Sequence, residues 1–173
     1  MITGFPPIAA ANAKILILGS VPGIASLEKQ EYYAHPRNSF WNIIAQFADC
    51  PPLLSYEQKK AVLIENEIAL WDVLKHCQRE GSLDSSIESQ SIVTNDFELF
   101  FKEHRDIMFV LFNGTKAEKE YKKRVIPLIG PQFDHLTYYR LPSTSPAMAQ
   151  LSKQDKLQKW LAVMNKIKEH FSC

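Results

Sequence analysis

Four short apolar runs alternate along the chain with longer stretches of helical periodicity. The runs are KILIL at 14–18, EIALW at 67–71, IMFVLF at 107–112 and LTYYR at 136–140. Short apolar runs that end at turn residues are typical of buried strands. Strands that alternate with helices favour a parallel sheet covered by helices on both faces. We therefore predict an α/β fold, a three-layer α/β/α sandwich around a central four-stranded parallel sheet.

The segments between these strands carry the helical signals. In the last segment, apolar residues recur at steps of three and four from Leu157 to Phe171, and Ser152 is a suitable N-cap. Residues 78–94 are polar and rich in serine, so a long loop is expected there, a kind of segment that is often functional. Helices are predicted at 39–48, 56–65, 95–104, 115–125 and 153–170.

Length and charge limit the function classes. The 173 residues suit one domain, 1–173, with a single core. A net charge of +1 provides no strongly basic surface, so any DNA contact must depend on few local charges and on backbone N–H groups. No apolar run reaches the roughly 18 residues of a membrane span, and the first 14 residues show no secretory signal, so neither membrane nor export is expected.

Cysteine and histidine usage suggests neither disulfides nor a metal. Cys50, Cys77 and Cys173 are odd in number and distant in sequence, which fits free thiols in a reducing cytoplasm. The five histidines show no ligand spacing. We expect a cytoplasmic protein without a structural metal.

A loop of unusual composition follows each predicted strand. In open parallel sheets, ligands bind in the crevice beyond the carboxyl ends of the strands. All four loops should therefore converge on one binding crevice. They are residues 19–23, 72–84, 113–116 and 141–147.

The first loop, GSVPG at 19–23, follows its strand as a phosphate-binding loop would. It lacks the Gly-Lys-Ser/Thr ending of nucleoside-triphosphate loops and is not GxGxxG. It is either a tight Pro-Gly turn or a backbone that must approach a ligand closely.

The string YYAHPRNSFW at 32–41 concentrates aromatic, basic and amide side chains just before a helix. An aromatic face beside hydrogen-bonding groups suits a base flipped out of DNA. Asn38 could instead be a helix N-cap. Phe40 and Trp41 are expected in the core, whereas no core role is evident for Tyr33, His35, Arg37 and Asn38.

The loop LPSTSPA at 141–147 is rich in hydroxyl groups. Ser and Thr hydroxyls donate hydrogen bonds to phosphate without adding charge. Alternatively, the loop is only a connection into the final helix.

These three motifs, in this order, resemble those of the uracil-DNA glycosylase superfamily. AHPRNSFW is similar to the AHPxNxFW of mismatch-specific uracil-DNA glycosylases, and LPSTSPA is similar to a motif of thymine-DNA glycosylases. The likeness covers residues 14 to 160. Three further strings, IALWDVL at 68–74, GSLDSSI at 81–87 and FNGTKA at 112–117, complete a resemblance to the deoxyinosine (hypoxanthine-DNA) glycosylase family.

The resemblance implies hydrolysis of the bond between a damaged base and deoxyribose, without cofactor or metal. The partner would be double-stranded or single-stranded DNA that carries such a base, and we expect a monomer. Tyr33 matches an aromatic that stacks on the flipped base, and Asp72 matches an Asn that recognises the base edge. Asp72 could instead only cap the turn after its strand. Ser20, Val21 and Asn113 complete the expected base-binding set, and the expected DNA contacts are Arg37, Ser143, Thr144, Ser145, Ala147 and Met148.

Two positions depart from the superfamily pattern. Val21 stands where uracil-removing relatives have Asp or Asn to position water, and Leu141 stands where His or Asn steadies the departing base. By elimination, Asn38 is the expected catalytic residue, holding the water near the sugar. An amide does not titrate, so the rate should vary little between about pH 6 and 9.

Three functions stay open on the sequence alone. The first is removal of hypoxanthine, which the whole motif set favours. The second is removal of uracil or of mismatched thymine. The third is a DNA-binding module on the same fold without catalysis, which the apolar residues Val21 and Leu141 would allow.

Overall fold

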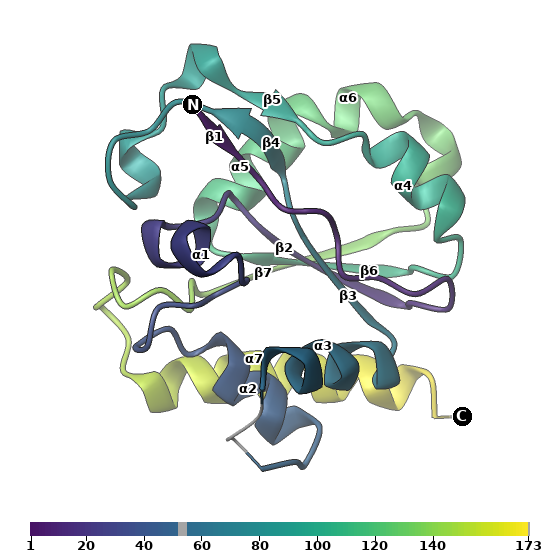
Figure 1. The fold of residues 1–173 in the computed structure, drawn as a ribbon. Helices are drawn as coiled ribbons and strands as arrows, with labels where there is room; N and C mark the ends of the chain where they lie inside the picture. Colours follow the sequence, from purple (N-terminus) through teal and green to yellow (C-terminus); the bar gives the residue numbers. More distant parts are fainter. Residues whose placement is uncertain (52–54, 173) are drawn as a thin grey trace.

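A computed structural model describes residues 1–51 and 55–172, and a parallel sheet forms its centre. Within these residues the sheet has four strands in the order β3-β2-β6-β7, all parallel (Figure 1). The predicted fold class and the four predicted strands are confirmed. The strands are β2 (Ile15–Gly19), β3 (Ile68–Asp72), β6 (Phe109–Asn113) and β7 (Thr137–Leu141).

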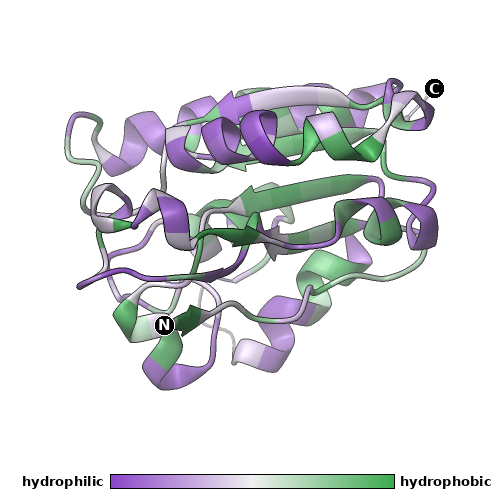
Figure 2. Cartoon of the chain, turned by 90° about the horizontal axis from the view of Figure 1, so that it is seen from above, coloured by the Kyte–Doolittle hydropathy of each residue, from purple (hydrophilic) through white to green (hydrophobic). Residues whose placement is uncertain are grey.

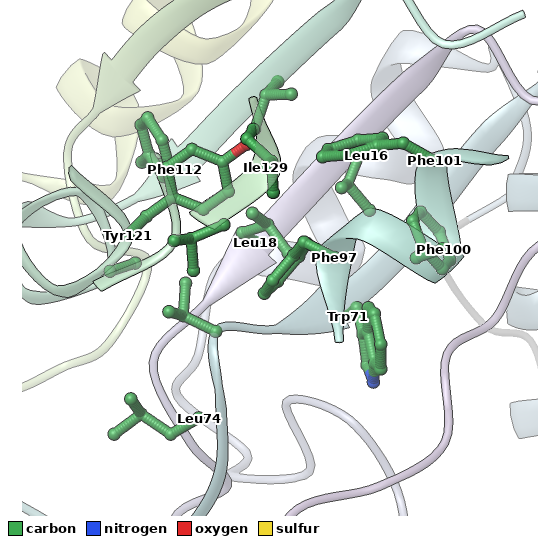
Figure 3. Packing of buried hydrophobic residues seen from close by; sticks show 14 of the residues in the cluster. Leu16, Leu18, Trp71, Leu74, Phe97, Phe100, Phe101, Phe112, Tyr121 and Ile129 are labelled. Atoms are coloured by element: carbon green, nitrogen blue, oxygen red, sulfur yellow. The ribbon is translucent and has the colours of Figure 1, made fainter. Parts of the chain in front are cut away.

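Alternate residues of the strands supply two separate cores, because successive side chains in a strand point to opposite faces. Leu16, Leu18 and Phe112 join the cluster on one face, which Figure 3 shows together with Trp71 and Phe97. The intervening residues join the cluster on the other face. They include Ile15, Ile17, Leu70 and Leu111.

Helices cover each face of the sheet. Apolar side chains from α4 (Phe97–Glu103), α5 (Thr115–Arg124) and α6 (Ile126–Ile129) complete the first cluster. The second cluster is completed by α2, α3 and α7, which lie together below the sheet in Figure 1. In Figure 2 the central strands are mostly green, whereas the helices around them carry both green and purple. These helices are α2 (Phe40–Phe47), α3 (Tyr56–Glu65) and α7 (Lys153–His170).

Several short elements were not predicted. Helix α1 (Ile24–Lys29) follows the GSVPG loop directly. A small antiparallel sheet joins β1 (Ile2–Thr3), β4 (Leu74–Cys77) and β5 (Val93–Thr94). Elements this short carry no periodic pattern, and β1 exists only because it pairs with a strand more than 70 residues away.

The segment 78–94, predicted as a loop, is largely irregular but ends in β5. It contains two short 3-10 turns, η1 (Asp84–Ser86) and η2 (Ser89–Ser91), and a third turn, η3 (Pro131–Phe133), precedes β7. The final helix has the predicted bounds, and Ser152 caps it in a capping box with Asp155.

The cysteine prediction can be compared with two of the three residues. Cys50 is half-buried and Cys77 is buried, and both are free thiols. Cys173 lies outside the described residues. In the part of the chain that the structure describes, no helix combines the length and the apolar character needed to cross a bilayer.

Candidate active site

The four loops that follow the parallel strands surround one pocket, as expected. Its volume is about 1030 Å³, at the upper end of the range for small-molecule sites. Helix α1 and the segment between β7 and α7 lie at the same end of the sheet (Figure 1). The sequence-predicted residues from Ser20 to Met148 all line this pocket. The lining segments are 19–26, 32–38 and 143–150, with parts of 72–85 and Asn113.

The floor of the pocket is built where β2 and β3 end side by side. Gly19 pairs with Asp72 in the sheet register. A Cβ atom on Gly19 would lie 2.5 Å from Asp72 Oδ1 and 2.8 Å from Tyr33 Oη. The Gly residue is therefore required for space, and it brings a carboxyl group and a phenol hydroxyl to one point on the floor.

Asp72 is a buried carboxyl group with unused hydrogen-bonding capacity. It is 4% exposed, and its Oδ2 atom has no hydrogen-bond partner among the described residues. The turn after β3 is held by Asn95, whose Nδ2 donates to Asp72 O at 2.7 Å, and not by the Asp72 side chain. The Asp72 side chain therefore does not cap the turn after β3, which was the alternative role considered for it.

Burial sets the protonation of Asp72. Desolvation raises its pKa to about 7; the Asp84 carboxylate also raises it, and Arg79 lowers it. About half of the Asp72 side chains are therefore neutral at pH 7, and the neutral form can donate a proton in a hydrogen bond as well as accept one. The pocket thus contains a group that titrates between pH 6 and 9, which removes the basis for expecting a flat pH profile.

Tyr33 is held in an unusual conformation beside this carboxyl. Its φ of 53° lies in the left-handed region, which is uncommon for a residue other than glycine. Its ring packs on Phe40 at a centroid distance of 4.2 Å. Its hydroxyl is buried without a partner among the described residues, and desolvation and then Asp72 raise the pKa of that hydroxyl. Strain and an unsatisfied hydroxyl at one residue are typical of functional sites.

Asn38 lies at the start of α2, on the wall of the pocket. Its Oδ1 accepts from Phe40 N at 3.0 Å, and Ser39 is the formal N-cap without a side-chain cap bond. Asn38 therefore does support the beginning of the helix. This bond uses Oδ1, and no hydrogen bond from the Asn38 NH₂ group occurs among the described residues. Asn38 is one of the residues that line the pocket.

The hydroxyl-rich loop is anchored from two sides. Asn113 Nδ2 donates to Thr144 Oγ1 at 3.0 Å, and Thr144 N donates to Asn113 Oδ1 at 2.9 Å. From α7, Lys156 Nζ donates to Ser145 O at 2.9 Å, and Trp160 Nε1 donates to Pro142 O at 2.8 Å. Asn113 thus primarily supports the loop, which these four hydrogen bonds attach to β6 and α7.

The remaining predicted DNA contacts lie at the rim. Arg37 is exposed and forms no salt bridge within the described part of the chain. Ser143, Ser145 and Met148 are half-buried, and Ala147 is exposed. These residues are accessible to a ligand backbone that crosses the mouth of the pocket.

The two apolar departures from the superfamily pattern have structural roles. Val21 is 8% exposed and packs in one core cluster, and Leu141 is 4% exposed and packs in the other. Neither residue contributes a polar side chain to the pocket, although Val21 is among its lining residues.

Sequence reasoning missed three contributors to the site. Asp84 lines the pocket and accepts from Ser20 Oγ at 2.6 Å. Arg79 Nη2 donates to Pro22 O at 2.7 Å, and Lys156 anchors the hydroxyl-rich loop. Asp84 and Arg79 fall in the serine-rich segment, which was expected at the crevice although no single residue in it was assigned a role. Lys156 occupies a polar helix position whose burial no local pattern shows.

No metal cluster is found in the described ranges. Across residues 1–51 and 55–172, no three His, Cys, Asp or Glu side chains lie close enough together to hold an ion.

These features define a class of protein. A parallel α/β sandwich with an aromatic ring and a buried carboxyl group at its strand ends is suited to bind a planar base. The anchored hydroxyl-rich loop beside them is suited to contact a phosphodiester backbone. The sequence model of the uracil DNA glycosylase superfamily matches residues 6–167. The chain belongs to this superfamily, as its motifs indicated.

Individual relatives narrow the comparison. The chain is 38% identical over 162 residues to a hypoxanthine DNA glycosylase of Methanosarcina acetivorans, covering 92% of this chain and 96% of the relative. It is 39% identical over 115 residues to the protein of the same name from Methanosarcina barkeri, covering 66% and 72%. A solution NMR structure from M. acetivorans, named as a candidate uracil DNA glycosylase, is 36% identical with a TM-score of 0.78, covering 96% of this chain and 98% of that one.

Proposed function

We propose that this chain is a monofunctional DNA glycosylase that flips a deaminated base out of DNA and removes it by hydrolysis, with hypoxanthine as its substrate. The observation that carries the proposal is the pocket floor, where the unpartnered Asp72 carboxyl lies beside Tyr33. The names of the two Methanosarcina relatives support the choice of base.

Asp72 complements the hydrogen-bonding edge of hypoxanthine. The base presents an N1–H donor next to its O6 acceptor. A neutral carboxyl accepts from N1–H through one oxygen and donates to O6 through the other, as an amide would. The raised pKa of Asp72 provides that neutral form near pH 7. Uracil carries a similar edge, so the size of the pocket and the absence of a polar side chain at Val21 supply the preference for a purine.

The reaction separates charge, and the pocket stabilises both parts. The electron pair of the glycosidic bond leaves with the base, and positive charge develops on the sugar. Fixed dipoles and the Asp72 proton stabilise the leaving base. Asn38 holds the water that bonds to C1′, and an abasic site and a free base result.

Tyr33 and the hydroxyl-rich loop hold the substrate during this step. Stacking of the flipped base on Tyr33 contributes about 1–3 kcal/mol, which offsets much of the cost of flipping. Ser143, Ser145 and Arg37 contact phosphates at the rim. We expect the protein to act as a monomer in the cytoplasm on double-stranded or single-stranded DNA, without cofactor or metal.

A panel of labelled oligonucleotides tests the proposal. Each carries hypoxanthine, uracil, xanthine or a thymine mismatch, and heating in alkali cleaves the strand wherever a base has been lost. We expect cleavage at hypoxanthine first. Preferred cleavage at uracil would instead assign the activity suggested by the name of the M. acetivorans structure. Binding without any cleavage would leave a non-catalytic DNA-binding module.

A further inference from the structure

The serine-rich segment folds back over the GSVPG loop. Arg79 Nη2 donates to Pro22 O at 2.7 Å, and Ile24 N donates to Ser82 Oγ at 2.9 Å. These contacts tie two parts of the chain that are more than 50 residues apart in sequence. The turn at 82–85 consequently becomes a wall of the pocket.

The same turn brings a carboxylate to the first motif. Ser20 Oγ donates to Asp84 Oδ1 at 2.6 Å, and Asp84 lines the pocket. No hydrogen bond to Asp84 Oδ2 occurs among the described residues. Ser20 is buried and precedes Val21, the position at which uracil-removing relatives have their water-positioning side chain. The 82–85 turn therefore places the Asp84 carboxylate beside the first motif, in which Val21 carries no polar side chain.

Asp84 acts electrostatically on the floor of the pocket. Its charge raises the pKa of Asp72 and, to a smaller extent, that of the Tyr33 hydroxyl. The positive charge of Arg79 lowers the pKa of Asp72. The pocket thus combines a buried carboxyl group of raised pKa on its floor with an exposed carboxyl group on its wall. A similar difference in environment separates acid and base roles in other hydrolases of glycosidic bonds.

We propose that Asp84 is a catalytic residue that stabilises the positive charge on the deoxyribose and accepts the proton of the attacking water, with Ser20 as its positioning residue. The proposal rests on the proposed glycosylase function and deepens it.

The step balances with the groups present. The glycosidic bond breaks and its electron pair goes to the departing base. The water oxygen, held by Asn38, forms the bond to C1′, and one water proton passes to Asp84. Asp84 then releases this proton to solvent, and the base takes up one proton from solvent.

The variant Asp84→Asn tests the proposal because it keeps the shape of the side chain and its acceptor for Ser20 but removes the charge. We expect single-turnover release of hypoxanthine to fall by about 100-fold, within the range for loss of a general base. Affinity for DNA with a non-cleavable abasic-site analogue should be unchanged or tighter, because the variant removes a negative charge that repels phosphate.

Glu88→Gln is the matched control, since it removes one exposed charge from the same segment outside the pocket and should leave the rate unchanged. Ser20→Ala should slow the wild-type protein by about tenfold but have no further effect in the Asp84→Asn background, because Ser20 acts through Asp84.

Three outcomes would overturn the proposal. They are a rate for Asp84→Asn within threefold of wild type, an equal loss in Glu88→Gln, or a loss of affinity that matches the loss of rate. Each still leaves hypoxanthine release by the wild-type protein intact, so the proposed function fails only if that release is absent.

Discussion

At the scale of single residues, Asp72 combines a chemical role with a cost in stability. Its pKa is about 7 in the folded protein and about 4 in an unfolded chain, so the folded state binds more protons between these values. The free energy of unfolding should therefore fall as the pH rises from 4 to 7, by up to about 4 kcal/mol.

Asp72→Asn should remove this loss of stability. We expect the variant to gain stability over wild type at pH 8 and much less at pH 5, measured by urea unfolding. Asp134→Asn, an exposed substitution, should show no such difference between the two pH values. An equal effect of Asp72→Asn at both pH values would mean that the carboxyl is not desolvated as described.

The proton on Asp72 also determines the pH profile of activity. Asp84, Arg79 and the Tyr33 hydroxyl face this carboxyl, and burial is the largest contribution to its raised pKa. Single-turnover release of hypoxanthine should decline above pH 7, by about tenfold per unit once Asp72 is ionised. This decline should be absent in Asp72→Asn. A flat wild-type profile from pH 6 to 9 would exclude Asp72 as a hydrogen-bond donor to the base.

Asn38→Ala should slow cleavage by about 100-fold, the effect of losing one positioned polar group. Affinity for DNA should be nearly unchanged, because the phosphate contacts lie elsewhere. The Asn38–Phe40 hydrogen bond predicts a small loss of stability as well. A normal rate together with a lower melting temperature would show that Asn38 only supports the start of α2.

Prediction at this scale found the position of a residue where that position follows from its own motif, while the role of the residue stays a prediction. Tyr33 and Asn38 were expected at the crevice because YYAHPRNSFW combines ring and amide groups before a helix, and both line the pocket. Asp84 could not be placed, because its position depends on a hydrogen bond to Ser20 across 64 residues.

At the scale of elements, α7 supports the site through the loop that precedes it. Lys156 is buried, its pKa is lowered by desolvation, and it donates to Ser145 O. Lys156→Met should keep the apolar stem of the side chain but release the loop. We expect DNA affinity to weaken by about tenfold without loss of the fold.

Lys159→Met provides the control for charge, because Lys159 is exposed on the same helix. Fluorescence anisotropy on identical duplexes compares the two variants. Equal weakening by both would show that only net charge matters and that the Lys156–Ser145 hydrogen bond does not.

The central strands and the last helix were predictable because each is long enough to show a clear pattern of apolar residues. The strands around 14–18 and 107–112 are continuous apolar runs, and the last helix has both a clear stripe and a cap. The small antiparallel sheet was not predictable, since β1 and β5 have two residues each and gain their order from β4 alone.

At the scale of the whole molecule, a net charge of +1 limits how DNA is bound. The protein can neutralise only a few DNA phosphates. A plot of the logarithm of the DNA association constant against the logarithm of salt concentration should therefore have a slope shallower than about −5, the value for six phosphate contacts. Arg37→Ala should reduce the slope by about 1 and weaken binding equally on all sequences. A loss confined to hypoxanthine-containing DNA would mean that Arg37 contacts the base.

The preference for hypoxanthine over uracil is the central claim, and a comparison of cleavage rates on matched duplexes tests it most directly. Single-turnover rates are compared for hypoxanthine and uracil placed at the same position, opposite the same base, at pH 7 and one salt concentration. A valine at position 21 and a pocket of about 1030 Å³ predict faster release of hypoxanthine. Release of uracil at an equal or higher rate would contradict the assignment.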